Sequence, residues 1–510
     1  MLKDKRLMCV CSDLVESQIA HKSVIIRQLS SSRKDEARYG RFLQNSRLSV
    51  AALNGHLLSS QDFSVCGIDV LSIQDSSEIG IIGGKNAVLG FGSIGNGLGY
   101  GYYIHPHLLF NAASGALLGL GSLYSWHRED NRAANLARRE HIGSLSTADA
   151  DAYKAARRAE KTKVDSHKPI REKEGYRWIA SAWESLSQCQ GAASVTVIAD
   201  CETDTYEYLV ALGHADFARA GDPPCKVLVR SDNNRLLAVQ QKVYNPEKGK
   251  YYKQQVRLYE HLRECAVKHK AEVVIKESPN RAARTAQFAL KYEQVKLRRP
   301  ERLTEANAYF EGKKIPKFME VTVVEFTEIS PPPQGEKPIK WTLITTHIVD
   351  NDAFALKIVT YYQARWRIEM YFRCLKKTGF AIENILNQTK EGILKLTSTT
   401  LMAAVKIIQL IQARDNPQIL IESVFSSQEI EVLKVLSKSL EGNTEKQRNP
   451  YPQESLAFGV WVIARLGGWK GYASQRKPGA YTLQIGLNKF HLFYEAYNMA
   501  KELILNDFAP

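Results

Sequence analysis

One helical segment carries a stripe of polar side chains that strongly limits what the chain can form. Residues 361–379 read YYQARWRIEMYFRCLKKTG and contain no proline and no interior glycine. We therefore expect them to end a single long helix that begins near Asp352 and stops at Gly379. At about 100° per residue, one narrow face of this helix collects polar groups, which are Tyr362, Arg365, Glu369 and Lys376, with Arg373 beside them. A carboxylate among cations suits a metal ion that is itself bound to a polyanion such as phosphate.

The spacing along this stripe resembles a known signature. Its Tyr, Arg, Glu and Lys are separated by two, three and six residues. This spacing resembles the YREK signature of the insertion-sequence-four family of DDE transposases, and the uninterrupted RWRIE at 365–369 is similar to the Tn-five branch of that family. The alternative interpretation is a surface helix whose charges align by chance.

The charge balance makes nucleic acid the expected partner. The 510 residues include 69 Lys and Arg against 54 Asp and Glu, a net charge of +15, and 44% of them are hydrophobic. Such a chain should form roughly two to four globular units and approach phosphates. Its eight cysteines include no CxxC pair, so neither a zinc ribbon nor a disulfide framework is indicated. We expect no signal peptide and no membrane segment, and hence a bacterial cytoplasmic, nucleoid-associated protein.

Two further carboxylates follow predicted strands. Residues 65–74 are rich in β-branched residues, and Asp75 opens the turn after them, while Asp200 follows the buried-type strand 195–199 and opens a helix. The carboxyl ends of strands are where α/β sheets place their chemistry. Asp69 competes with Asp75 but lies about 20 Å of strand away, so we prefer Asp75. Asp200 also suits a helix N-cap, and capping a helix is compatible with binding a metal ion. Both positions resemble the catalytic Asp residues of the family.

The long connection between Asp200 and Glu369 predicts an inserted, mostly antiparallel β subdomain at about 220–340, because alternating segments recur there. Its loops hold several cations that would line a path for phosphates, Arg284 among them, and Arg230 ends a segment that matches the family's VRS. A proline-rich turn at 331–338 precedes Trp341. In the family, a Trp at this position stacks on a base flipped out of the duplex; a core Trp is the alternative.

The two ends of the chain have helical patterns. Arg38 and Arg41 lie on a predicted helix near the N-terminus that would lay cations along DNA, with a solvated helix face as the alternative. The segment 39–45 is similar to one in the family's end-binding domain. Members of the family usually carry roughly twenty more residues before the stretch that residues 3–7 resemble. Helices beyond residue 380 resemble the family's C-terminal domain, which pairs two subunits.

Together these residues predict an α/β protein with metal-dependent phosphodiester chemistry. Asp75, Asp200 and Glu369 would hold two divalent ions, for which all-oxygen ligation favours Mg²⁺, with Mn²⁺ as a substitute. The resemblance implies an RNase H-like catalytic core at 61–380 that contains the β insertion, a helical DNA-end-binding domain at 1–60 and a helical dimerisation domain at 381–510. It also implies cleavage of transposon ends through a hairpin intermediate, followed by strand transfer into target DNA by a homodimer.

Two other functions remain as alternatives at this stage. The late start of the chain relative to the family motivates a non-enzymatic product that pairs with a full-length transposase and inhibits it. A general nuclease on the RNase H-like fold would tolerate the three acids but has no need for Trp341 or for the basic stripe.

Overall fold

The computed structural model describes residues 4–81, 90–247, 249–277, 281–303, 308–414, 416–472, 475 and 477–507. Contacts between Cα atoms divide the chain into two units. The first unit consists of Met1–Val65, Ser76–Glu140 and Arg367–Pro510, and the second of Cys66–Asp75 and His141–Trp366.

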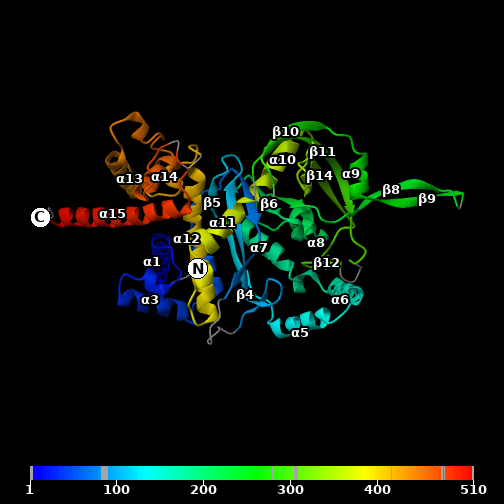
Figure 1. Cartoon of the computed structure of the whole chain (residues 1–510), viewed down its shortest axis with the longest axis horizontal. Helices are drawn as coiled ribbons and strands as arrows, with labels where there is room; N and C mark the ends of the chain where they lie inside the picture. The colour runs from blue at the N-terminus through cyan, green and yellow to red at the C-terminus, as the bar shows by residue number, and fades with distance from the viewer. Residues whose placement is uncertain are drawn as a thin grey trace. The chain divides into compact units, whose positions relative to one another are not determined.

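The second unit is built on a mixed sheet with the strand order β1-β6-β7-β15-β14-β11-β8-β9, and β10 also pairs with β11 (Figure 1). The bounds of these strands are β1 (Asp69–Gln74), β6 (Ser194–Ala199), β7 (Cys225–Arg230), β8 (Leu236–Asn245), β9 (Lys250–Arg257), β10 (His269–Ile275), β11 (Arg284–Arg298), β14 (Phe318–Glu328) and β15 (Lys340–Thr345). The short strands β12 (Tyr309–Phe310) and β13 (Lys313–Lys314) form a separate pair.

Strands β1, β6 and β7 are parallel, and Asp75 and Asp200 follow the carboxyl ends of two neighbouring strands, β1 and β6. Five of the six residues are buried in β1 and again in β6, which is typical of strands covered on both faces. Ile73 of β1 pairs with Ile198 of β6. Asp75 and Asp200 each stand two residues further on, so they follow adjacent parallel strands at the same level. This confirms the predicted position of both residues at strand ends.

The strands after β7 are antiparallel. β15 pairs antiparallel with β7, β14 with β15, and β11 with β14. The segments predicted as alternating strands are strands, but β7 pairs in parallel with β6 and so extends the parallel part of the sheet. The β8–β9 hairpin projects away from the rest of this unit's sheet (Figure 1).

Helices flank the sheet of the second unit. They are α6 (Thr147–His167), α7 (Tyr176–Ser187), α8 (Tyr206–Gly213), α9 (Leu258–Glu264) and α10 (Asp352–Ala364). α7 packs against β1, α8 against β7, and α10 against β14 and β7. Helices therefore cover β1 and β7, the two strands that flank β6 in the sheet.

The predicted continuous helix from Asp352 to Gly379 is wrong. α10 begins at Asp352, where Asn351 caps it by accepting a hydrogen bond from the N–H of Phe354, but it ends at Ala364. The N–H groups of Arg365 and Trp366 then bond to carbonyl groups three residues back, which tightens the backbone into a 3₁₀-type turn.

Two further pieces follow this interruption. α11 spans Arg367–Arg373, and a π-helical turn spans Cys374–Thr378. Because the backbone changes its winding twice, a spacing of 100° per residue does not hold across the segment. The regular stripe expected from the sequence therefore does not exist on one helix surface.

The first unit combines an antiparallel sheet with most of the remaining helices. Its central strand, β4 (Gly99–Asn111), pairs with β2 (Ser77–Gly80), β3 (Gly92–Ile94) and β5 (Leu117–Trp126). Its helices are α1 (Lys5–His21), α2 (Ile26–Leu29), α3 (Arg33–Gln44), α4 (Val50–Ser59), α11, α12 (Lys390–Ala413), α13 (Ser427–Leu440), α14 (Leu456–Leu466) and α15 (Ala480–Asp507). α5 (Arg132–Gly143) spans the boundary between the units.

α12 is the central helix of the first unit. It packs against α1, α3, α4, α14 and β5. The side chain of Lys395 is buried within it and donates to the carbonyl groups of Leu43 at 3.1 Å and Asn45 at 2.8 Å, which satisfies the C-terminal end of α3. Of the helices that the structure describes, α12 is long and apolar enough to cross a membrane, and 78% of its most apolar window is buried inside the protein.

Candidate active site

Two carboxylates of the second unit share one guanidinium group. Arg365, at the end of α10, donates from Nη1 to Asp75 Oδ2 at 2.9 Å, and its Nη2 lies 3.4 Å from Asp200 Oδ2. The side chain of Arg365 is 9% exposed, against 20% for Asp75 and 23% for Asp200. The planar fork of an arginine suits this bridging role. The structure thus brings together three residues that the sequence analysis assigned to the site.

Asp200 has further donors around it. It precedes a 3₁₀ turn, η2 (Cys201–Thr203), and its Oδ1 accepts from the N–H of Cys201 at 2.7 Å, so the expected capping role is present. The Nε of Arg230 lies 2.9 Å from the same oxygen. Burial raises the pKa of Asp200, but the Cys201 hydrogen bond and the charges of Arg365 and Arg230 outweigh it and lower this pKa overall. Asp200 is therefore held as a carboxylate.

Tyr362 contacts this acid, and Trp341 contacts Tyr362. The hydroxyl group of Tyr362 donates to Asp200 Oδ1 at 3.2 Å, and burial together with the Asp200 charge raises the pKa of Tyr362. Trp341, on β15 opposite Phe326 of β14, meets the Tyr362 ring edge to face with centroids 5.5 Å apart. Trp341 is only partly buried, so it is not a fully enclosed core residue. Tyr362 and Arg230 thus contact Asp200, and Trp341 contacts Tyr362, all within the second unit.

Glu369, Arg373 and Lys376 belong to the first unit. Glu369 is half-buried on α11, Arg373 is exposed at the end of that helix, and Lys376 lies on the π-helical turn. Arg367, the first residue of α11, donates to the carbonyl group of Gly115 at 2.8 Å and lies over the ring of Phe110. These two contacts anchor α11 within the first unit.

Arg284, predicted to face DNA, is committed to ion pairs inside the second unit. Its Nε and Nη2 bond to Glu328 at 2.9 and 3.1 Å, and its Nη1 bonds to Glu336 at 2.6 Å. Glu336 lies in the proline-rich turn, so Arg284 fastens this turn to the sheet. The hydrogen bond from Arg284 lowers the pKa of Glu328.

The two N-terminal arginines differ in their surroundings. Arg38 of α3 forms an ion pair with Asp13 of α1 at 2.7 Å and lies 3.5 Å from Asp35. This contact joins two helices of the first unit. Arg41 is exposed on α3. Arg41 is thus the more exposed of the two arginines.

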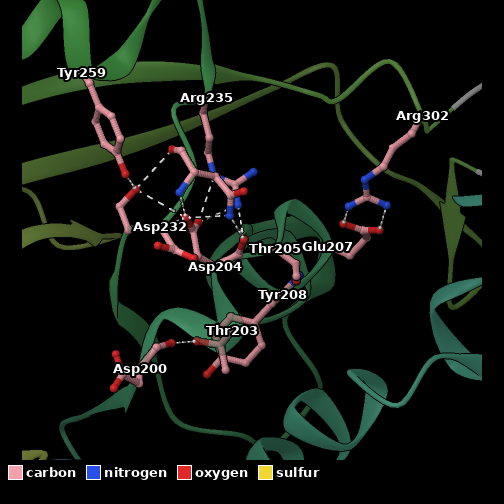
Figure 2. Close-up of polar contacts among 12 residues, drawn as sticks. Asp200, Thr203, Asp204, Thr205, Glu207, Tyr208, Asp232, Arg235, Tyr259 and Arg302 are labelled. Carbon is pink, nitrogen blue, oxygen red and sulfur yellow. Dashed lines mark hydrogen bonds and ion pairs between the residues drawn. The ribbon is translucent and has the colours of Figure 1, made fainter. Parts of the chain in front are cut away.

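The sequence analysis missed a buried polar network next to Asp200. Asp204 and Arg235 form its centre (Figure 2). The one available signal was the second Asp of the segment Asp-Cys-Glu-Thr-Asp at 200–204, followed some thirty residues later by Asn-Asn-Arg at 233–235. Nothing local in the sequence shows that these segments meet.

The residues in the second unit fit a divalent cation by their chemistry. Asp75 and Asp200 supply carboxylate oxygens from adjacent strand ends, and Mg²⁺ takes oxygen ligands. Among the described residues there is no group of three or more His, Cys, Asp or Glu side chains arranged to hold a metal. The guanidinium of Arg365 lies against both acids, and that of Arg230 lies against Asp200.

A comparison with protein families agrees with this chemistry. Residues 230–405 match the family model described as "Transposase DDE domain". The matched segment begins at Arg230 and contains Trp341, α10, α11 and the residues from Tyr362 to Lys376. It begins after Asp75 and Asp200. Together with the paired strand-end carboxylates, the match supports a DDE transposase.

Proposed function

We propose that the chain is a DNA transposase that cuts the ends of its own element and joins them to target DNA. The observation that carries the proposal is the convergence of Asp75, Asp200 and Arg365, since Arg365 belongs to the segment that matches the DDE domain while both acids lie outside it. The fold would be RNase H-like with a β insertion, as in the family that the YREK spacing and RWRIE resemble.

Asp75, Asp200 and Glu369 are proposed as the three metal-binding acids. Glu369 is four residues after Arg365, and consecutive Cα atoms are about 3.8 Å apart, so the chain keeps their Cα atoms within about 15 Å. Bound Mg²⁺ would lower the pKa of an attacking water and stabilise the charge on a leaving oxygen.

The other residues around Asp200 would handle phosphate groups. In DNA cleavage, an oxygen of water attacks the phosphorus atom, the 3′-oxygen leaves with a proton, and a 3′-hydroxyl and a 5′-phosphate result. Arg365 and Arg230 offer N–H groups to phosphate oxygens, and the buried hydroxyl group of Tyr362 stays protonated and can donate a hydrogen bond. Lys376 and Arg373 would add positive charge.

The subsequent steps are proposed on the resemblance. The freed 3′-hydroxyl would attack the opposite strand and form a hairpin, water would open the hairpin, and the same 3′-hydroxyl would attack target DNA. Trp341 is partly exposed next to Tyr362, so its ring is available to stack on an unpaired base. A homodimer on the nucleoid would hold both ends.

The experiment compares DNA that carries the inverted repeats flanking the gene with the same DNA carrying scrambled repeats. We expect Mg²⁺-dependent nicking at the boundary of the repeats and hairpin products on a denaturing gel, with scrambled DNA left intact. Equal cutting of both substrates would instead identify a general nuclease. Absence of cutting by the purified chain with either Mg²⁺ or Mn²⁺ would contradict the proposal.

A further inference from the structure

Asp204 is a buried carboxylate with donors on both oxygens (Figure 2). Its side chain is 0% exposed. Its Oδ1 accepts from Arg235 Nε at 2.9 Å and Nη2 at 2.5 Å. Its Oδ2 accepts from the main-chain N–H groups of Asp232 at 2.9 Å and Asn233 at 3.1 Å, and from the Asn233 side-chain amide at 3.1 Å. This carboxylate therefore fixes the whole turn formed by residues 231–235.

Asp204 is also the far end of the turn that presents Asp200. The N–H and hydroxyl groups of Thr203 donate to the carbonyl oxygen of Asp200 at 3.1 and 2.8 Å. The N–H of Asp204 donates to the carbonyl oxygen of Cys201 at 3.0 Å. These bonds make residues 200–204 one tight unit, so a shift of Asp204 would be passed to Asp200.

The turn that Asp204 holds begins directly after Arg230, the last residue of β7. Arg230 in turn contacts Asp200 through Nε at 2.9 Å and Cys201 Sγ through Nη2 at 3.4 Å. The two turns follow strands that are themselves paired, and they are joined further by the Arg230–Asp200 ion pair and by Asp204.

The Arg230–Asp200 ion pair and the Asp204 network differ in how firmly they can hold the two turns in place. Arg230 is 39% exposed and Asp200 is 23% exposed, and an ion pair that accessible to water is worth about 0–1 kcal/mol and does not fix a geometry by itself. Asp204 and Arg235 are 0% and 8% exposed, so their hydrogen bonds are rigid and shielded from water. The parallel pairing of β6 with β7, with Ala199 opposite Val229, sets the backbones of Asp200 and Arg230 side by side, and the Asp204 network adds the buried contacts that fix the turns after these strands.

We propose that Asp204 is a positioning residue that holds Asp200 and Arg230 in register and thereby sets how tightly Asp200 binds a divalent cation. The inference rests on the proposed function, because it takes Asp200 as a metal ligand. Residues that orient metal ligands typically change metal affinity by about 10–100-fold when they are replaced. Asp204→Asn should therefore weaken the cation bound through Asp200 by at least about tenfold.

Glu207 supplies a matched control on the same segment. It is 2% exposed and forms two hydrogen bonds of 2.8 Å with Arg302, so it is also a buried carboxylate paired with an arginine (Figure 2). Its partner lies in a different loop and has no part in the turn at 231–235. Glu207→Gln removes a buried charge close to the site without touching the connection to Arg230.

Asn233→Ala supplies a milder variant. It removes the amide that donates to the Asp204 carboxylate and to its carbonyl group, at 3.1 and 3.0 Å, and leaves no buried charge unpaired. Asp204→Asn, by contrast, strands the Arg235 charge in the interior, which is costly. If Asp204→Asn does not fold, Asn233→Ala decides the question, and we expect it to weaken Mn²⁺ binding in the same direction, because it removes one of the hydrogen bonds to the Asp204 carboxylate.

The experiment measures Mn²⁺ binding to the whole purified chain by electron paramagnetic resonance, with Asp200→Ala identifying the site that depends on Asp200. We expect Asp204→Asn or Asn233→Ala to weaken this site and Glu207→Gln to leave it within about twofold. Cleavage by Asp204→Asn should recover at high Mn²⁺ concentration, which a general loss of structure would not show.

Two results would overturn the inference in distinguishable ways. Unchanged Mn²⁺ affinity in the folded Asp204→Asn variant, or equal weakening in Glu207→Gln, rejects the positioning role while the proposed function stands. Wild-type protein without any Mn²⁺ site that depends on Asp200 rejects the metal assignment itself, and the inference with it.

Discussion

Arg365 Nη1 donates to Asp75 Oδ2 at 2.9 Å, and this bond ties the end of α10 to the end of β1 within the second unit. The same guanidinium reaches Asp200 at 3.4 Å. One arginine thus neutralises two acids that stand at the ends of adjacent parallel strands. The shared guanidinium offsets the repulsion between these two carboxylates.

Replacing Arg365 should make the protein depend on Mg²⁺ for stability. Arg365→Ala removes the guanidinium that Asp75 and Asp200 share and leaves Arg230 beside Asp200, so we expect the metal-free Tm to fall and Mg²⁺ to raise it more than in the wild type. Thermal unfolding with and without Mg²⁺ measures this. Arg367→Ala is the control, because Arg367 bonds to the carbonyl group of Gly115. If Mg²⁺ raised the Tm of the wild type, Arg365→Ala and Arg367→Ala by the same amount, Asp75 and Asp200 would not be a cation site.

Trp341→Ala should impair the hairpin step more than the first nick. A base stacked on an aromatic ring contributes about 1–3 kcal/mol, so hairpin formation should slow by about 5–150-fold. Trp341→Phe keeps an aromatic face and should retain most of the rate. Single-turnover cleavage followed on a denaturing gel separates the two steps. Equal slowing of both steps would indicate that Trp341 only packs against Tyr362.

Arg284→Gln should lower stability without changing how DNA binding depends on salt. Arg284 is paired with Glu328 and Glu336, so it should not release a counterion from DNA. Arg41→Gln, at an exposed position, should reduce the slope of log K against log salt concentration by about one. Gel-shift titrations at several salt concentrations measure both slopes. A reduced slope for Arg284→Gln would restore its assignment as a phosphate ligand.

Acid should destabilise the protein through His107 of β4. Complete burial lowers the pKa of His107 to about 3, whereas an unfolded His has a pKa of about 6.5. Between these values the unfolded state binds one more proton, so stability is fully present above about pH 6.5 and falls as the pH drops toward 3, by at most about 1.4 kcal/mol per pH unit. Urea unfolding across this range should show a flatter profile for His107→Gln than for the wild type. Parallel profiles of stability against pH for the two proteins would show that His107 does not cause the loss of stability in acid.

The parts of this fold that the sequence predicted are those set by local pattern. The buried run of β1 with Asp75 after it, the strand before Asp200 and the capped start of α10 at Asp352 all follow from hydrophobic pattern and turn residues. The interruption after Ala364 did not follow, because nothing in the composition of residues 361–379 breaks a helix.

The site was predictable only in part, for a related reason. Asp75, Asp200 and Arg365 were identified by position and spacing, but their shared ion pair joins segments that are far apart in the sequence. Arg284 and Asp204 depend even more on distant partners, since Glu328 and Arg235 cannot be paired with them by any local rule. Charge pattern alone made Arg284 look like a ligand for phosphate, whereas tertiary contacts assign it to internal carboxylates.

The most direct test of the central claim is cleavage of DNA carrying the element's inverted repeats by Asp75→Ala, Asp200→Ala and Glu369→Ala. Asp69→Asn is the control, because Asp69 lies on β1 at its other end and bonds to Ser194. We expect each Ala variant to bind the DNA but to cut it about a thousandfold more slowly or not at all, while Asp69→Asn cuts normally. Cleavage at the wild-type rate by any one of the three Ala variants would contradict the account.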